Sequence, residues 1–219
     1  MFHYLYKMNH INVTTILSLI ILWILVALLD IFVAENIDDT EANKNTLPDI
    51  IHNNINIWPK TERLPSVLVI SSFIYCLLRL VSINTNLIAL LLLTSIILRL
   101  CRILVYSSTL TPSAMAKEYN HCKTHLLKYI GISFNKEKDT CADNMFSGHT
   151  LLLSVPIVIL VIFSNYLYEK IGLILYLFVT SFLIINSRMH YTSDVIIANL
   201  LAIGFVNVFI NLFHKYKYL

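Results

Sequence analysis

The sequence is poor in charged residues. Only 13% of its 219 residues are Asp, Glu, Lys or Arg, whereas 57% are hydrophobic. An ordinary soluble domain carries about a quarter charged residues. The net charge of +3 is small and scattered, so we expect no nucleic-acid partner. With only 4 Gly and 5 Pro the chain also lacks low-complexity linkers. This composition indicates a polytopic membrane protein.

Motifs for common cofactors are missing as well. No glycine loop of the Walker type occurs, so the sequence does not predict nucleotide use. No Cys and His spacing resembles a zinc site, and we expect no metal and no other cofactor. Cysteine is scarce: Cys76 and Cys101 lie in apolar runs and are expected to pack there. Cys122 and Cys141 share a polar loop, where a disulfide would indicate an oxidising compartment and the alternative is two unpaired thiols.

Six apolar runs approach the roughly 20 residues that a helix needs to cross the hydrocarbon core. We therefore expect an all-α protein of six transmembrane helices, forming a single transmembrane domain over residues 1–219. The predicted spans are residues 15–34, 64–83, 87–106, 150–167, 171–187 and 194–213. A long polar loop, residues 107–148, precedes the fourth span. Six spans place both termini on one side, so the end of span three and the starts of spans four and six meet on the other side.

Two polar stretches at the starts of spans four and six carry the candidate chemistry. His190 and Asp194 are four residues apart, which on a helix is one face. The carboxylate would then fix the imidazole tautomer and leave the other nitrogen free to attack. The alternative is a pair that only caps the helix. His149 follows Ser147 and Gly148, at a helix start that suits a phosphate, and would supply a proton; the alternative is an interfacial histidine.

Arginines near the end of the third span are further candidates. Arg99 and Arg102 are three residues apart, and ionisable groups within a span are usually functional or paired. Arg102 would bind a phosphate through two hydrogen bonds, and the alternative for both residues is snorkelling to the interface. For Arg79, on the opposite side, we prefer snorkelling. The other histidines are interpreted as surface or interfacial residues: His3, His10, His52, His121, His125 and His214.

Two motifs carry a family resemblance. In order they are Asp143-x-x-Phe146-Ser147-Gly148-His149-Thr150 and His190-Tyr191-Thr192-x-Asp194. Together they resemble the sphingomyelin synthase family, part of the lipid phosphate phosphatase superfamily. Further matches are the Leu47-Pro48-Asp49 segment, the stretch from Arg102 through Tyr106 to Leu110, and the positions of Cys122 and Cys141, which match luminal loop cysteines. The chain departs from the family at Ala142, usually Gly, and at Asn144, often an aromatic.

The resemblance implies a lipid phosphate phosphatase-like bundle of six helices with cytosolic termini. It implies transfer of phosphocholine or phosphoethanolamine from a glycerophospholipid to ceramide, with release of diacylglycerol. His190 would form a phosphohistidine, Asp194 would orient it, and His149 would protonate the departing oxygen. The substrate-binding residues would be Asp143, Ser147, Gly148, Tyr191, Arg99 and Arg102. The partners would be membrane lipids, and the oligomeric state, a homodimer included, stays open.

Two other functions remain open. One is a lipid phosphate phosphatase or phospholipase C-type hydrolase, with water in place of ceramide, and the other is a non-catalytic scaffold or ceramide-binding protein. Arg188 lies too close to His190 to supply the Ser-Arg element typical of lipid phosphatases, which favours a transferase. The resemblance implies a Golgi or plasma membrane location with a luminal or exoplasmic site. The larger number of Lys and Arg on the side of the site would instead place that side in the cytosol.

Overall fold

The described part of the chain is helical. The computed structural model describes residues 11–36, 49–55, 64–108, 147–187, 189–216 and 218. Its helices are α1 (Val13–Asn36), α2 (Ile50–Asn54), α3 (Leu64–Ile83), α4 (Asn86–Ser108), α6 (Gly148–Phe163), α7 (Leu167–Asn186) and α8 (Thr192–Lys215). No strand occurs among these residues, which confirms the all-α prediction for them. The predictions made for Cys122, Cys141, Asp143 and Arg188 lie outside the described residues.

Most of the long helices have the length and composition of membrane spans. Five meet both criteria: α1, α3, α4, α7 and α8. Helix α6 is as apolar but has only 16 residues, a rise of about 24 Å against a hydrocarbon core of about 30 Å. The described helices therefore support an integral membrane protein, and the count of six spans stays a prediction.

The fourth predicted span, residues 150–167, needs correction. Helix α6 ends at Phe163, and α7 already begins at Leu167. The three residues between them turn the chain, and Ser164 stabilises this turn because its hydroxyl accepts the N–H of Tyr166 at 3.2 Å. A hydroxyl that bonds to nearby backbone competes with helix continuation. Because the flanking residues are apolar on both sides, hydropathy alone placed the boundary several residues too late.

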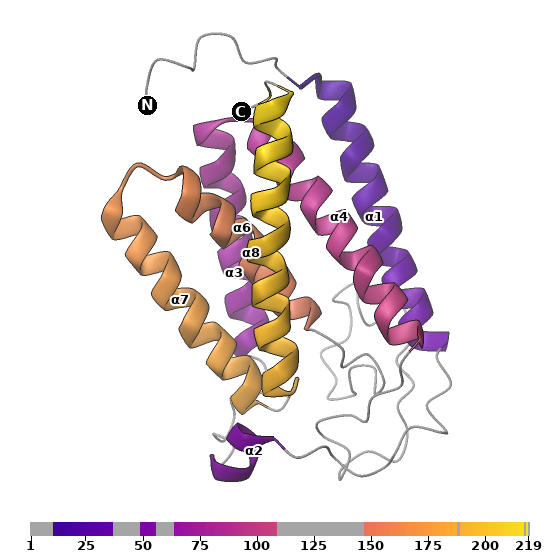
Figure 1. Cartoon of the computed structure of the whole chain (residues 1–219), viewed down its shortest axis with the longest axis vertical. Coiled ribbons are helices and arrows are strands. Elements are labelled where there is room, and N and C mark those ends of the chain that lie inside the picture. The colour runs from indigo at the N-terminus through magenta and orange to yellow at the C-terminus, as the bar shows by residue number, and fades with distance from the viewer. Residues whose placement is uncertain are drawn as a thin grey trace.

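Helix α6 occupies the centre of the bundle. It contacts α3, α4, α7 and α8, while α1 packs on α4. Figure 1 shows that the start of α1 and the end of α8 lie at the upper end of the molecule. The end of α4 and the starts of α6 and α8 lie at the lower end, as predicted for the side that carries the site. We call this lower end the site end.

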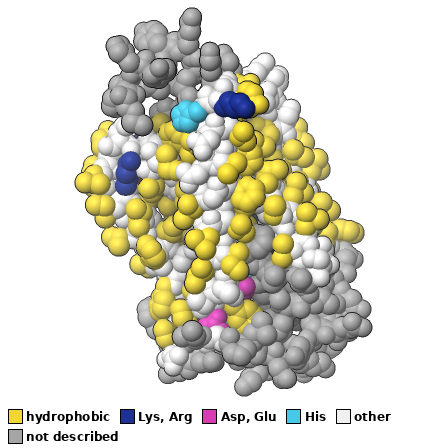
Figure 2. Space-filling model, viewed as in Figure 1, with side chains coloured by type: hydrophobic (Ala, Val, Ile, Leu, Met, Phe, Trp, Pro, Cys, Tyr) yellow, Lys and Arg dark blue, Asp and Glu magenta, His cyan; other side chains and the backbone are white. Residues whose placement is uncertain are grey.

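The outer faces of the helices are apolar. Large hydrophobic side chains are exposed on several helices, for example Val67, Leu78, Phe178 and Leu200. Figure 2 shows such side chains over much of the face in view, with charged groups in only a few places. A contiguous apolar surface of this kind marks contact with a membrane or a partner. Together with the helix lengths, it supports contact with lipid.

Arg79 is paired, which corrects the prediction that it snorkels to the interface. Its guanidinium donates two hydrogen bonds to the Glu169 carboxylate, at 2.8 and 3.0 Å. Tyr75 donates a third to the same carboxylate at 2.8 Å, and Ser164 donates another. These bonds join α3 to the start of α7 at the end of the bundle away from the site end. The partner could not be identified from sequence because it lies on a distant helix.

Candidate functional site

Two histidines from separate segments meet at the site end. His149 lies in the first turn of α6, where the Ser147 hydroxyl caps the helix by accepting the N–H of Thr150 at 3.1 Å. His190 lies in the turn before α8, and the two imidazole centroids are 6.1 Å apart. The N–H of Ser147 also donates to the backbone carbonyl of Asp194 at 3.3 Å. The two sequence motifs are thus joined directly.

His190 and Asp194 do not share a helical face, contrary to the interpretation of their spacing. Helix α8 begins only at Thr192, so His190 lies in the turn before it. The Asp194 carboxylate accepts the N–H of Tyr191 at 3.1 Å, which caps the helix. The same oxygen, Oδ2, lies 4.0 Å from Nδ1 of His190, longer than a hydrogen bond. The carboxylate therefore serves as a helix cap and also faces the imidazole.

The environment of His190 favours its neutral form. The side chain is buried, and Nδ1 has no hydrogen-bond partner among the described residues. Burial lowers the pKa of His190 well below its usual value, and the nearby charges of His149 and Arg102 lower this pKa further. The imidazole is therefore neutral at pH 7 and keeps a nitrogen lone pair for attack.

This lowered pKa predicts a pH dependence of stability. The unfolded chain binds a proton at this histidine near pH 6.5, whereas the folded chain binds it only at lower pH. The stability contributed by neutral His190 is complete above about pH 6.5 and is lost as pH falls through the folded pKa. We expect the Tm of the detergent-solubilised protein to fall more steeply below pH 6.5 than the Tm of His190→Asn, whose side chain does not titrate. Parallel Tm profiles would contradict the assignment.

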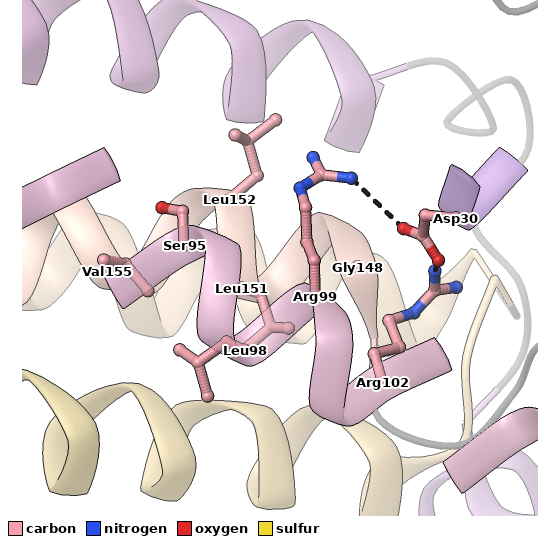
Figure 3. Close-up of a pocket in the computed structure, with 9 residues that line it drawn as sticks. All are labelled: Asp30, Ser95, Leu98, Arg99, Arg102, Gly148, Leu151, Leu152 and Val155. Carbon is pink, nitrogen blue, oxygen red and sulfur yellow. Dashed lines mark hydrogen bonds and ion pairs between the residues drawn. The ribbon is translucent and has the colours of Figure 1, made fainter. Parts of the chain in front are cut away.

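Arg99 and Arg102 converge on a carboxylate that sequence reasoning did not pair with them. Asp30 of α1 accepts from Arg102 Nη1 at 2.7 Å and from Arg99 Nη1 at 3.1 Å, as Figure 3 shows. Arg102 and Asp30 are buried, and Arg99 also lies over the Trp23 ring, 5.3 Å from its centroid. Snorkelling therefore does not describe Arg102. A phosphate that bound here would approach guanidiniums already arranged by a carboxylate.

A small pocket adjoins this ion pair and combines charged and aliphatic walls. Asp30 and the two arginines form one side, and Leu98, Leu151 and Val155 form the other. Gly148 lies next to Arg102, since a Cβ at this position would be 3.4 Å from Arg102 Cζ, at van der Waals contact. The guanidinium therefore lies against the first turn of α6, which also carries His149. This geometry suits the phosphate region of a lipid.

The segment before α3 contributes two buried residues that sequence reasoning did not place in the site. Asp49 caps α2, and its carboxylate also accepts from the backbone and the hydroxyl of Thr192. His52, interpreted above as a surface or interfacial residue, is buried, and its Nε2 lies 3.1 Å from the carbonyl oxygen of Ile185. The Pro48-Asp49 resemblance was the available signal, but it identified no partner.

The structure brings most of the predicted site residues to the same end. Tyr191 is buried beside His190, and its ring lies 5.8 Å from the His52 ring. On the other side of the pair, Ser66 of α3 lies 3.5 Å from Nε2 of His149. Helices α3, α4 and α6 and the α7–α8 turn therefore each contribute to one site.

Comparison with known families gives a match over the C-terminal part of the chain. Residues 140–212 match the family described as PAP2 superfamily C-terminal, about a third of the chain. The matched region contains His149, His190 and Asp194. The match supports the lipid phosphate phosphatase superfamily and chemistry of the phosphatase or phosphotransferase type on lipid phosphates. No curated protein matches the chain.

Proposed function

We propose that the protein transfers a phospho-headgroup, phosphocholine or phosphoethanolamine, from a glycerophospholipid to ceramide. The observation that carries this proposal is the approach of His149 and His190, whose ring centroids are 6.1 Å apart. The charge of Arg102 acts on His190, and lipid-exposed helices surround the site. Two histidines are sufficient for a covalent transfer, because one can attack while the other donates and accepts the proton.

The first half-reaction forms a phosphohistidine. Neutral His190 attacks the donor phosphorus, a P–N bond forms, and the P–O bond to diacylglycerol breaks. Protonated His149 gives its proton to the departing oxygen. Asp194 faces Nδ1 across 4.0 Å and stabilises the positive charge that develops on the ring, which leaves Nε2 as the attacking nitrogen.

The second half-reaction reverses the roles. Neutral His149 takes the proton of the ceramide hydroxyl, the ceramide oxygen attacks phosphorus, and the P–N bond breaks. The products are diacylglycerol and a ceramide that carries the phospho-headgroup, and both histidines return to their starting states. Arg102 supplies positive charge next to the transferring group in both steps, the main contribution that a protein makes to phosphoryl transfer.

The proposed substrates reach the site from the membrane. Exposed apolar side chains on α3, α7 and α8 support lateral access of two-chain lipids. The motif resemblance supports a Golgi or plasma membrane location with the site on the luminal or exoplasmic face. In that orientation the start of α1 and the end of α8, which lie away from the site end, face the cytosol.

A lipid phosphate phosphatase is the second candidate, favoured by the PAP2 superfamily match. It would use the same histidines, with water in place of ceramide in the second step. The two candidates differ in the acceptor, so an assay that varies the acceptor separates them.

Reconstitution of the full chain in liposomes tests the proposal. Vesicles contain phosphatidylcholine or phosphatidylethanolamine and labelled ceramide. We expect labelled phosphoceramide and diacylglycerol in equal amounts, and no diacylglycerol when ceramide is omitted. Release of free phospho-headgroup in vesicles without ceramide would show that the protein is a hydrolase and not a transferase. Release of phosphate from phosphatidic acid would show the same. The absence of turnover with all of these lipids would contradict both. The preferred donor identifies the headgroup.

A further inference from the structure

The carboxylate of Asp49 is surrounded by hydrogen-bond donors from two parts of the chain. Oδ1 accepts the N–H of Ile51 at 2.9 Å and of His52 at 3.1 Å, which starts α2. Oδ1 also accepts the Thr192 hydroxyl at 2.8 Å, and Oδ2 accepts the Thr192 N–H at 2.7 Å. Thr192 is the first residue of α8. One buried carboxylate thus joins α2 to the start of the helix that follows His190.

A second contact holds α2 on the other side of the same turn. Nε2 of His52 lies 3.1 Å from the carbonyl oxygen of Ile185, in the last turn of α7. The His52 ring also faces Tyr191, with centroids 5.8 Å apart. Figure 1 shows α2 beneath the end of α7. The α2 segment therefore contacts the chain before and after His190.

Local hydrogen bonds at the start of α8 join Tyr191 to the residues that follow it. The Tyr191 N–H donates to the Asp194 carboxylate, and the Tyr191 carbonyl accepts the N–H groups of Asp194 and Val195. The Thr192 N–H instead donates to Asp49, on a distant segment. The first N–H groups of a helix have no partner within it, so Thr192 needs an acceptor from elsewhere. Burial raises the pKa of Asp49, but hydrogen bonds from His52 and Thr192 outweigh it and hold this pKa below its usual value. The acceptor is thus ionised and suits the positive end of α8.

We propose that Asp49 is a positioning residue for His190. By fixing Thr192, it holds the turn that places the His190 imidazole near Asp194 and His149. This inference rests on the proposed function for its activity readout. Asp49 touches no reacting atom and acts only through the α2 clamp, which we define as Asp49, His52 and Thr192.

The chemistry of the carboxylate gives an isosteric test. In Asp49→Asn one oxygen becomes an NH2 group, which donates and cannot accept. Whichever way the amide is turned, it meets either the N–H of Thr192 or the donors around Oδ1, and buried donors lose their acceptor. A displacement of about 1 Å at a reacting group costs about 10²-fold in rate. We expect kcat to fall by about that factor while KM for both lipids is unchanged.

Glu169→Gln is the matched control. It replaces an equally buried carboxylate with four hydrogen-bond donors around it, but away from the site end. We expect it to lower Tm and leave kcat unchanged. A purely structural role for Asp49 would make the two variants alike. Equal kcat for both, or a kcat loss in Asp49→Asn that merely follows its Tm, would overturn the proposal.

Variants of Thr192 test whether Asp49 affects kcat through its hydrogen bonds with Thr192. Thr192→Ser keeps the hydroxyl that donates to Asp49, and we expect nearly full kcat. Thr192→Val removes it, and we expect an intermediate loss. The double variant Asp49→Asn with Thr192→Val should have a kcat only slightly below that of Asp49→Asn alone, because both changes remove the same interaction. Additive losses would place the action of Asp49 elsewhere.

A readout independent of activity separates this inference from the proposed function. Histidine NMR of isotope-labelled protein reports the pKa of His190, which we expect to rise toward its usual value in Asp49→Asn but not in Glu169→Gln. An inactive wild-type protein with this NMR shift would contradict the proposed function and leave the clamp supported. Active wild-type and Asp49→Asn proteins, an inactive His190→Ala protein and no NMR shift would contradict the clamp alone.

Discussion

We expect replacement of His190 with Ala to abolish the proposed transfer to ceramide, and replacement of His214 with Ala to leave it intact. His190 is the attacking group of the proposed mechanism, and loss of a nucleophile costs at least about 10⁴-fold in kcat. His214 is a suitable control because it is exposed and belongs to the last turn of α8, the helix that follows His190, away from the site end. The measurement is phosphoceramide formation in liposomes. Turnover that survives His190→Ala would refute the phosphohistidine.

The His149→Gln variant tests whether His149 supplies the proton to the departing oxygen. With a natural donor we expect a loss of about 10²- to 10⁴-fold, the usual contribution of a general acid. With a donor whose leaving group needs no proton, such as 4-nitrophenyl phosphocholine, the first-turnover burst of nitrophenolate should be nearly normal, because only the second half-reaction then needs His149. His190→Ala should be inactive with both donors. An equal loss in the rate of the first half-reaction with both donors would show that His149 does not supply the proton.

We expect replacement of Arg102 with Met to lower both stability and activity. The substitution removes the shorter of the two arginine bonds to the buried Asp30 carboxylate and leaves the bond from Arg99, at 3.1 Å. Breaking a buried pair costs about 3–5 kcal/mol, and we expect about 3 because Arg99 remains. An arginine that stabilises phosphoryl-transfer charge contributes about 10³-fold or more to kcat. Unfolding in mixed micelles and the liposome assay measure the two effects.

The double variant Arg102→Met with Asp30→Leu separates these effects. It removes the carboxylate together with its main partner, and replacing both members of a buried pair by apolar residues is often neutral. Arg99 is partly exposed and keeps its contact with Trp23. We expect most of the stability to return and the activity to stay lost. Recovered activity would show that Arg102 does not bind the phosphate, and unrecovered stability would show that the unpaired carboxylate was not the cause.

Much of the fold followed from composition. A backbone surrounded by hydrocarbon must satisfy its own hydrogen bonds, so long apolar runs with few charges form helices. Residues near Ser164 escaped this reasoning because a turn formed by one hydroxyl changes hydropathy very little. The candidate histidines were also identifiable, since polar residues at the ends of apolar runs are unusual in a chain with so few charges.

The pairing of charged and polar side chains was not identifiable. The four-residue spacing of His190 and Asp194 predicted that both lie on one helix. Helix α8 begins only after His190, and residue spacing does not show where a helix starts. Arg79 and His52 were assigned to surfaces because their partners, Glu169 and the carbonyl of Ile185, lie on other helices.

The sequence by itself determined a helical membrane protein with two histidines and arginines at its span ends. This was possible because hydrophobicity and helical hydrogen bonding act locally along the chain. Only the tertiary structure decided that Asp30 accepts hydrogen bonds from both Arg99 and Arg102, and that Asp49 accepts the N–H of Thr192 at the start of α8. Such contacts join residues far apart in sequence, and they depend on how helices pack rather than on any pattern within one helix.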